Sequence, residues 1–504
     1  MKKMNKLLAL VLAMVMVLGL ATVASATDIT ITGGAENSVY SAWKLLNSTD
    51  GGDGKFAYTI NETYRDALSE VTGKSDDAEI VTYISKLDAD GIRAFADAMY
   101  AKVKTMTADA TSESRVFNDV DQGYYLIAET TLGDTTDTYS LVMLDTAGQT
   151  AIEVATKEDK PTLEKKIIEK NDSTGVVSGW QDGADYDVND AVPFKLTGTV
   201  SSKYASYKTY YYAFHDNMSA GLTFVADSVV VKIDGKTVSS DKYTVVTTGL
   251  NDGCTFEVVF NDLKTVSAED GTVVTPSSKI TVEFSATLNN GCVIGKPGNP
   301  NEAKLEYNNN PYYEGEGKPD DTSETPWDKV IVFTYQADVN KVDSEGNALE
   351  GAGFTLYKWN KDANDYVEVK AIEVAEDQTT FSFTRLDAGQ YKLVETTVPA
   401  GYNKAEDVIF TIDATYDTDA ANPVLNTIVV KDKNGTVISD ETKDATFSVD
   451  VDNGGVETNV VNNSGTELPS TGGIGTTIFY VLGGMLVVCA VVLMVSKKRM
   501  SAEG

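Results

Sequence analysis

Short runs of alternating apolar and polar residues dominate the chain between residues 27 and 467. Clear examples, rich in Val, Ile, Tyr and Phe, are Val229–Ile233, Phe256–Phe260, Ile280–Phe284 and Tyr391–Glu395. Gly, Asn and Asp separate the runs, as expected for tight turns. A period of two places one face of each strand in a core and the other in solvent. The pattern predicts a mostly β protein built from tandem, immunoglobulin-like β-sandwich domains.

One region near the N-terminus has helical periodicity instead. Apolar residues recur there every three or four positions, in the stripes Ile80, Tyr83, Ile84, Leu87 and Ile92, Phe95, Ala96, Met99, Val103. Asp90 precedes the second stripe in the place of an N-cap. The stripes predict helical insertions in the first domain.

The N-terminus carries a long apolar run. Three lysines within the first six residues precede it, the run covers 7–20, and small residues follow through Ala26. A basic, then apolar, then small-residue order is that of a secretory signal peptide. We expect cleavage after Ala26.

The C-terminus carries a second apolar segment, 477–495, followed by a basic tail. The segment is about long enough to span a bilayer, and a basic tail stays on the cytoplasmic side. Ahead of it stand Leu468, Pro469, Ser470, Thr471 and Gly472. This LPSTG resembles the LPxTG sorting signal of Gram-positive surface proteins. The resemblance implies that a sortase cuts between Thr471 and Gly472 and attaches the chain to the cell wall.

Composition limits the remaining function classes. The formal net charge is −33, which repels nucleic acid and favours solubility. Cys254 and Cys292 lie outside the C-terminal apolar segment, and in an oxidising location they can form a disulfide or remain two thiols. His215 is the only histidine. We find neither a catalytic triad nor metal-ligand spacing around it, so we expect no enzyme acting on outside substrates, no metal and no cofactor.

Three strands of the last domain each carry a polar residue on the face that should be buried. Lys341 shares its face with Ala337 and Val339, Glu395 with Tyr391 and Leu393, and Asn462 with Val460. Lys and Glu are seldom buried without a partner.

The segments NKVDSEGNALEGAGFTLY, YKLVETTVPAGY and VVNNSGTELPSTGG resemble the first strand, the E-box and the terminal strand of the collagen-adhesin B-type domain of Gram-positive pilins. In that family a lysine and an asparagine join into an isopeptide bond, assisted by a glutamate. The resemblance assigns these roles to Lys341, Asn462 and Glu395, with Asn463 as the neighbouring alternative. Burial lowers the lysine pKa and so supplies a neutral amine, while the acid polarises the carboxamide and passes a proton to the departing ammonia.

The segments PTLEKKI, FHDNMSAGLTF and EYNNNP resemble the middle domain of the same pilins, a sandwich of the collagen-adhesin A type. The resemblance implies an isopeptide bond between Lys165 and Asn309, with Asp216 as the acid. Neighbouring residues of the same types compete for these positions, namely Lys166, Asn308 and Asn310.

The first domain repeats part of the pattern. GYYLIAETT resembles an E-box and offers Glu129, but the opening strand, Ile29–Gly34, contains no lysine. We therefore expect no isopeptide bond there.

Lys157, in VATK, stands where backbone pilins carry the lysine that receives the next subunit, although the usual V-x-Y-P-K is incomplete. Lys160 is the competing candidate.

These resemblances follow one another in the order found in backbone pilins of sortase-assembled pili. They imply a signal peptide at 1–26, an N-terminal pilin domain at 27–159, a middle isopeptide-forming domain at 160–335, a C-terminal collagen-adhesin B-type domain at 336–467 and a sorting signal at 468–504.

The implied function is that of a structural subunit of a covalently polymerised pilus, secreted and anchored to the cell wall. The implied partners are pilin-specific and housekeeping sortases, identical subunits, minor pilins and peptidoglycan, with no nucleic acid. The alternative is a monomeric wall-anchored adhesin for a host or neighbouring-cell ligand. Only a polymer subunit needs a nucleophile such as Lys157, so this residue separates the two.

Overall fold

The computed structural model describes residues 26–134, 136–156, 159–250, 252–372, 374–375, 377–440, 446–465 and 474–500, the last range with side chains only at 482–495 and 497. Three predicted features fall outside these residues: the signal peptide up to residue 25, Lys157, and the pentapeptide 468–472.

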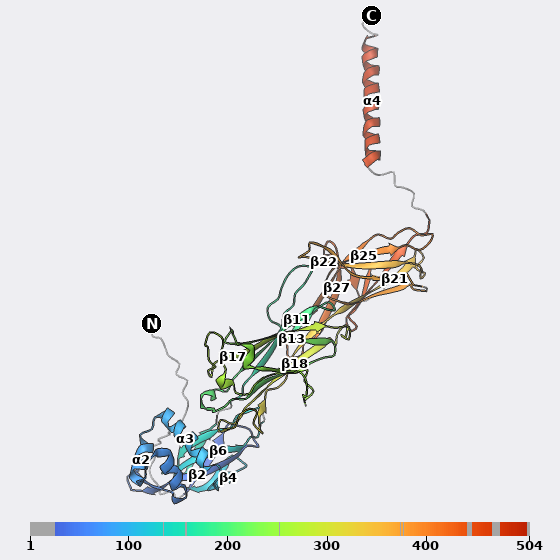
Figure 1. Ribbon diagram of the computed structural model, residues 1–504. Helices are drawn as coiled ribbons and strands as arrows, with labels where there is room; N and C mark the ends of the chain where they lie inside the picture. Colours follow the sequence, from blue (N-terminus) through green and yellow to red (C-terminus); the bar gives the residue numbers. More distant parts are fainter. Residues whose placement is uncertain are drawn as a thin grey trace.

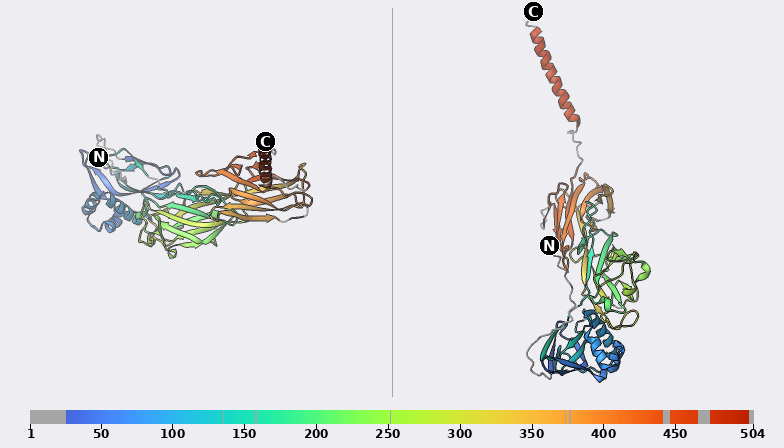
Figure 2. Two further views of the ribbon diagram at one scale, coloured as in Figure 1. Left: turned by 90° about the horizontal axis from the view of Figure 1, so that it is seen from above. Right: turned by 90° about the vertical axis from the view of Figure 1, so that its left-hand side faces the viewer.

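The described chain forms three β-rich units in a row, followed by a helix (Figure 1). The units lie end to end in two further views as well (Figure 2). The predicted mostly β architecture of tandem sandwiches is confirmed. The predicted domain boundaries stay predictions; they fall between β8 (Ala151–Ala155) and β9 (Leu163–Ile167), and one residue into β21 (Tyr335–Asp343).

The first unit combines two sheets with a group of helices. Its remaining strands are β1 (Ala26–Thr32), β2 (Val39–Asp50), β3 (Phe56–Ile60), β4 (Ala110–Ser112), β5 (Val116–Asp121), β6 (Gly123–Thr131) and β7 (Leu141–Asp145). The sheet orders are β5-β1-β8 and β3-β2-β6-β7, with β4 on β2.

The helices of this unit confirm the predicted insertion. They are η1 (Glu62–Tyr64), α1 (Arg65–Thr72), α2 (Asp77–Ser85) and α3 (Ala89–Val103). The predicted stripe of α3 is buried. Its N-cap is Asp88, not Asp90, because Asp88 has extended backbone and its Oδ1 accepts from the N–H of Gly91 at 2.8 Å. Asp90 lies in the first turn, where a carboxylate still favours the helix dipole.

The middle unit is a sandwich around the largest apolar cluster. Its further strands are β10 (Gly183–Asp185), β11 (Ala191–Thr199), β12 (Tyr212–Met218), β13 (Leu222–Ile233), β14 (Lys236–Thr237), β15 (Thr244–Val246), β16 (Phe256–Phe260), β17 (Lys279–Leu288), β18 (Asn299–Tyr307), β19 (Ser323–Glu324) and β20 (Asp328–Phe333), with short 3-10 turns at Tyr204–Ser206, Ser240–Lys242 and Leu263–Thr265. One sheet runs β14-β13-β17-β11-β9 and the other β10-β20-β18-β12-β16-β15, with β19 on β18. Their inner faces form the core.

The C-terminal unit is a second sandwich. After β21 its strands are β22 (Gly353–Asn360), β23 (Asp365–Ile372), β24 (Thr380–Leu386), β25 (Gly389–Thr397), β26 (Val408–Tyr416), β27 (Leu425–Asp432), β28 (Ser439–Asp440), β29 (Phe447–Asp450) and β30 (Gly455–Asn462). The sheets run β24-β21-β30-β29-β28 and β23-β22-β25-β26-β27. Because β21 and β30 pair in parallel, the first and last strands of the unit are neighbours.

Helix α4 (Ile474–Met500) follows and contains the predicted apolar segment 477–495. Within the part of the chain that the structure describes, no helix is both long enough and apolar enough to cross a membrane.

A cluster of carboxylates around one lysine joins the middle and C-terminal units. Lys358 Nζ donates to Asp187 Oδ2 at 2.5 Å and to Asp387 Oδ2 at 2.8 Å. Glu169 Oε2 accepts a hydrogen bond from the N–H of Asp185. The carboxylate of Asp185 accepts a second one from the hydroxyl of Tyr416 in β26. Burial, followed by the nearby Asp185 carboxylate, raises the pKa of Glu169 from 4.5 to about 10.

This pKa shift predicts a pH-dependent junction. A carboxyl whose pKa is raised in the folded state stabilises it fully below pH 4.5, and that contribution is lost as the pH rises toward 10. Glu169→Gln keeps the group neutral, so we expect the variant to melt higher than the wild type at pH 8 and at the same temperature near pH 4. Thermal unfolding across this range checks it, with exposed Glu368→Gln as the control. Parallel pH profiles for wild type and Glu169→Gln would contradict the prediction.

Candidate isopeptide and attachment sites

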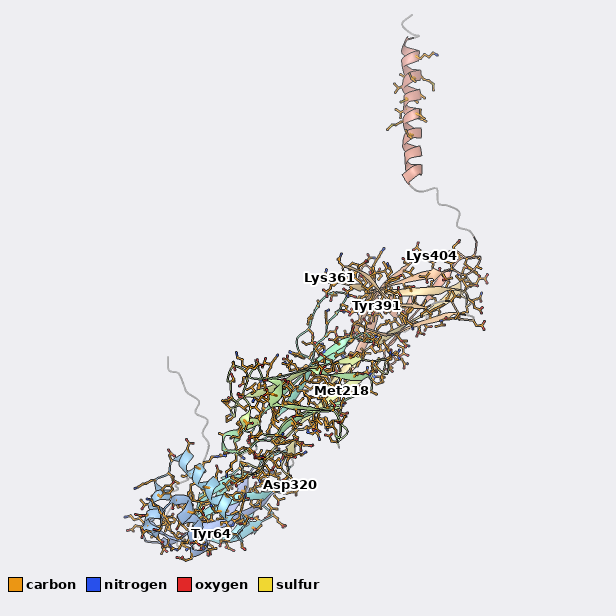
Figure 3. All side chains as sticks on the ribbon, in the orientation of Figure 1. Tyr64, Met218, Asp320, Lys361, Tyr391 and Lys404 are labelled. Carbon is orange, nitrogen blue, oxygen red and sulfur yellow. The ribbon has the colours of Figure 1, made fainter. Side chains whose placement is uncertain are left out.

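The C-terminal unit brings Lys341, Glu395 and Asn462 into one buried site. Lys341 and Asn462 lie on neighbouring strands β21 and β30, in a register that pairs Asp343 with Asn462. Glu395 comes from β25 in the opposite sheet, on the same strand as Tyr391, which is labelled in Figure 3. The exposed fractions of Lys341, Glu395 and Asn462 are 0%, 3% and 1%. Their predicted inward positions are confirmed.

Glu395 holds the side-chain amide of Asn462. Its Oε1 accepts from Asn462 Nδ2 at 2.8 Å, and its Oε2 accepts from the N–H of Ala405 at 2.8 Å. The amide oxygen of Asn462, Oδ1, has no hydrogen-bond partner among the described residues. A buried carbonyl oxygen without a donor costs free energy, so this amide oxygen is open to a hydrogen-bond donor.

The amine of Lys341 lies beside this amide. Nζ donates to the carbonyl oxygens of Val460 at 2.8 Å and Val342 at 3.0 Å, and Val460 precedes Asn462 by two residues on β30. Burial lowers the pKa of Lys341, although the Glu395 carboxylate acts in the opposite direction. The site therefore favours a neutral amine next to a carboxamide, the pair of groups from which an isopeptide bond forms.

The middle unit contains a buried pair of Lys165 on β9 and Asp216 on β12. Both are 0% exposed, and Lys165 Nζ donates to Asp216 Oδ2. The rings of Phe194 and Phe284 lie 5.4 and 5.3 Å from Nζ. Burial lowers the pKa of Lys165 and raises that of Asp216. Both directions favour a neutral amine beside a neutral acid.

The asparagine beside this pair is Asn301. Strands β12 and β18 pair with Asp216 opposite Ala303, so Asn301, two residues earlier, faces the same side of the sheet. Asn301 is 0% exposed, and its amide lies close enough to Asp216 to favour the ionised carboxyl. Neither polar atom of this amide forms a hydrogen bond of good geometry among the described residues. A buried, unsatisfied amide next to a lysine and an acid is thus present in this unit too.

The structure does not bring Asn309 to Lys165, so this assignment is corrected. Asn309 follows the end of β18, where its Nδ2 donates to Ser323 Oγ at 3.2 Å and its carbonyl accepts from the N–H of Tyr139 at 3.1 Å. At about 3.3 Å per residue, it lies on the order of 20 Å along the strand from Ala303. Asn309 therefore helps to join the first and middle units.

The competing residues of the middle unit also have other partners. Lys166 Nζ contacts Asp182 Oδ1 at 2.7 Å, and Asn308 Nδ2 donates to the carbonyl of Thr209 at 3.0 Å. Asn310 accepts from the N–H of the tyrosine two residues later. Alternation identified the correct face of β18. It could not identify the correct end of the strand, because the local sequence does not determine the register of β18 against β12.

Glu129 in the first unit is 4% exposed, and its Oε2 accepts from the N–H and Oγ of Ser140 at 3.2 and 3.0 Å. Burial raises the pKa of Glu129. The opening strand β1 supplies no lysine opposite this acid. The absence of an isopeptide bond in this unit stays a prediction.

The residues around the junction lysines differ in their contacts. Lys160 Nζ contacts Asp134 Oδ2 at 2.8 Å. Asp159 is buried and accepts from the hydroxyls of Thr138 and Ser201, which belong to the first and middle units. The sequence alone gave no signal for this link, because it depends on contacts with residues of two different units. The hydrogen bonds of Asp159 fix the chain two residues after Lys157.

The cysteines are free thiols, so the described structure contains no disulfide between Cys254 and Cys292. Both are buried in the middle unit.

Three family models match the chain in consecutive order. Residues 188–311 match the Gram-positive pilin backbone subunit 2, Cna-B-like domain; residues 336–423 match a prealbumin-like fold domain; and residues 460–501 match the LPXTG cell wall anchor motif.

Comparison with individual proteins gives three further similarities. The trypsin-resistant surface T6 protein of Streptococcus pyogenes serotype M6 is 27% identical over 417 residues, which cover 70% of this chain and 71% of that protein. The solved structure of the T6 backbone pilin is 19% identical, with a TM-score of 0.52 over 88% of this chain and 100% of that chain, and shows the shared fold. The major pilin SpaD of Corynebacterium diphtheriae is 16% identical, with a TM-score of 0.48 over 89% of this chain and 100% of that chain.

The pilin-backbone match falls on the unit that holds Lys165 and Asp216, and the wall-anchor match begins on the strand that holds Asn462. Units, anchor and relatives point to one class of structural protein rather than to an enzyme. The chain carries a Gram-positive pilin-backbone domain and a cell wall anchor motif, is similar over 70% of its length to a surface protein of Streptococcus pyogenes, and is a cell-wall-anchored structural subunit of a surface pilus of the backbone-pilin type.

Proposed function

We propose that this backbone pilin polymerises covalently, head to tail, and that each subunit is stabilised by two intramolecular isopeptide bonds. One bond joins Lys341 to Asn462 with help from Glu395. The other joins Lys165 to Asn301 with help from Asp216. The observation that carries the proposal is the burial of an amine, an acid and an unsatisfied carboxamide together, once in each of the last two units.

The same reaction accounts for both sites. The neutral Nζ of lysine attacks the Cγ of asparagine, whose carbonyl is polarised by the protonated acid. A new N–C bond forms and the bond from Cγ to Nδ2 breaks. The acid passes a proton from the attacking nitrogen to Nδ2, which leaves as ammonia. In the middle unit, burial shifts the pKa values of Lys165 and Asp216 toward their neutral forms, so no charge has to be created in the dry interior before the attack.

Polymerisation needs an acyl donor and an acceptor. By analogy with sortase substrates, cleavage between Thr471 and Gly472 gives a Thr471 acyl-enzyme, which a lysine of another subunit attacks. We assign that lysine as Lys157, since Lys160 already pairs with Asp134 and Lys165 is buried. A pilin-specific sortase would extend the fibre, and a housekeeping sortase would transfer it to peptidoglycan. Minor pilins are further expected partners.

The alternative function is a monomeric wall-anchored adhesin. It shares the anchor and the sandwiches but needs no junction nucleophile. A ladder of covalent multimers from the cell wall, resistant to detergent and recognised by an antibody to this chain, distinguishes the polymer from the monomer.

The mass of the folded, mature protein tests the two isopeptide bonds. We expect the wild type to weigh less than its sequence by two molecules of ammonia, because each bond releases one. Asn301→Ala and Asn462→Ala should each reduce the mass deficit to one molecule of ammonia, whereas Asn309→Ala should leave it at two. Intact-protein mass spectrometry measures the deficit of the wild type and of the three variants. A deficit that falls in Asn309→Ala but persists in Asn301→Ala would overturn the assignment in the middle unit.

A further inference from the structure

The one histidine of the chain lies in a cluster of metal-ligating groups on an interior strand of the middle unit. His215 is on β12, and Asp252 and Cys254 belong to the turn that leads into β16. His215 Nδ1 lies 2.8 Å from Asp252 Oδ2, and Cys254 Sγ lies 3.0 Å from the same oxygen. One imidazole nitrogen, one carboxylate oxygen and one sulfur therefore converge within 4.8 Å of one another.

Both ring nitrogens of His215 face carboxylate oxygens. Nδ1 faces Asp252, while Nε2 lies 3.1 Å from Glu306 Oε2. When Nε2–H is donated to Glu306, Nδ1 faces Asp252 Oδ2, and either a second proton or a cation lies between that nitrogen and the oxygen. With Nε2–H donated to Glu306, the arrangement matches the carboxylate–histidine–metal relay of protein metal sites.

The surroundings are negative despite two lysines. Lys304 Nζ lies 3.8 Å from Asp252 Oδ2 but makes a closer contact, 2.7 Å, with Glu324. Lys318 Nζ contacts Glu306 at 2.7 Å. Glu257 adds a further carboxylate, with Oε1 3.4 Å from His215 Nδ1. The four carboxylates outnumber the two lysines, so the cluster has residual negative charge for a divalent cation.

We propose that His215, Asp252 and Cys254 form a binding site for a divalent cation of zinc type, which links the turn before β16 to strand β12. A mixed nitrogen, sulfur and oxygen donor set suits Zn²⁺, whereas Ca²⁺ and Mg²⁺ prefer oxygen alone. Glu257 is the nearest candidate for a fourth ligand, and Glu306 orients the imidazole. This site is separate from the isopeptide chemistry and from wall attachment.

Only a small adjustment is needed to admit the ion. Tetrahedral bonds of about 2.0 Å to nitrogen and oxygen and about 2.3 Å to sulfur place the ligand atoms roughly 3.3–3.6 Å apart. The present separations of 2.8 and 3.0 Å from Asp252 Oδ2 must widen by about half an ångström. The Asp252 side chain is 27% exposed and can move outward.

Titration of the mature chain, residues 27–471, with Co²⁺ and then Zn²⁺ tests the proposal. Co²⁺ bound by a thiolate gives a sulfur-to-metal charge-transfer band in the near ultraviolet. We expect that band at one equivalent, its displacement by Zn²⁺, its loss in Cys254→Ser and its retention in Cys292→Ser, which removes the other buried thiol of the same unit. Glu306→Gln should weaken Zn²⁺ binding by about 10- to 100-fold.

Two further measurements keep the test decisive. Circular dichroism checks that Cys254→Ser is folded, and if it is not, Asp252→Asn at the exposed ligand replaces it, with the same tenfold or greater loss of affinity expected. Zn²⁺ should raise the melting temperature of the wild type and not that of Cys254→Ser or Asp252→Asn. Absence of the charge-transfer band in the wild type, its persistence in Cys254→Ser, or its loss in Cys292→Ser would overturn the proposal.

Discussion

Replacing Lys157 with alanine is expected to abolish the covalent ladder of multimers while leaving the monomer secreted and attached to the wall. In the proposed polymerisation the lysine supplies the amine that captures the Thr471 acyl group of the next subunit, and the variant has no nucleophile at this position. Immunoblots of cell-wall extracts from bacteria expressing the pilin sortase measure the effect. The expected loss is complete, because fibre growth stops at the first addition.

Lys160→Ala is the matched control for this variant. Lys160 is three residues away but pairs with Asp134 at 2.8 Å, and in the variant Lys157 keeps its place in the chain after β8. We expect a normal ladder from Lys160→Ala. A ladder that survives in Lys157→Ala and disappears in Lys160→Ala would move the attachment site. Normal polymerisation in both variants would refute a junction nucleophile altogether, and a wild type that never polymerises beside its sortase would favour the monomeric adhesin.

Replacing Glu395 with alanine is expected to prevent the bond between Lys341 and Asn462. The variant loses the group that holds the Asn462 amide at 2.8 Å and that would carry the proton to ammonia. Without the bond, the first and last strands of the C-terminal unit are no longer tied covalently. By analogy with a disulfide that closes a long loop, the unit should lose on the order of 2 to 5 kcal/mol of stability.

Thermal unfolding, trypsin digestion and intact mass together measure this second effect. We expect the Glu395→Ala protein to weigh less than its own sequence by one molecule of ammonia, where the wild type weighs less by two. We also expect it to melt at a lower temperature and to be cleaved faster by trypsin. Glu406→Ala, an exposed glutamate on the loop that follows β25, is the control and should keep the bond. If Glu395→Ala still shows the full mass deficit, the assisted mechanism is wrong for this unit.

Local periodicity was enough to predict that three polar side chains of the C-terminal unit face inward. Lys341, Glu395 and Asn462 each sit on a strand whose apolar neighbours have a period of two, so the face of every side chain followed from the sequence. The resemblance to pilin domains then supplied the chemistry. No knowledge of strand register was needed, because each of these strands offered one inward polar residue of the required type.

The middle site required information that the sequence does not contain locally. Strand β18 carries inward residues along its whole length, and both Asn301 and Asn309 follow the correct alternation. The choice between them depends on which residue lies near Asp216, which is a property of the pairing between β12 and β18. The resemblance of EYNNNP to the pilin middle domain favoured Asn309, although Asn301 lies on the same face.

Two further groups of contacts between distant segments were not predicted. The carboxylate cluster around Lys358 draws on a loop of the middle unit and on strand β22 and the turn after β24 of the C-terminal unit. His215 and Cys254 are separated by 39 positions in the sequence and meet because β16 pairs with β12. Metal-ligand spacing rules apply to ligands on one local segment, so they gave no signal here.

The most direct test of covalent polymerisation is mass spectrometry of peptides from purified, wall-derived fibres. We predict a branched peptide in which the carboxyl of Thr471 is joined to Nζ of Lys157. We also predict internal cross-links between Lys341 and Asn462 and between Lys165 and Asn301. Fibres whose Thr471 is joined to a different lysine would contradict the assigned acceptor. Thr471 found only on peptidoglycan, with no pilin-to-pilin branch, would contradict polymerisation itself.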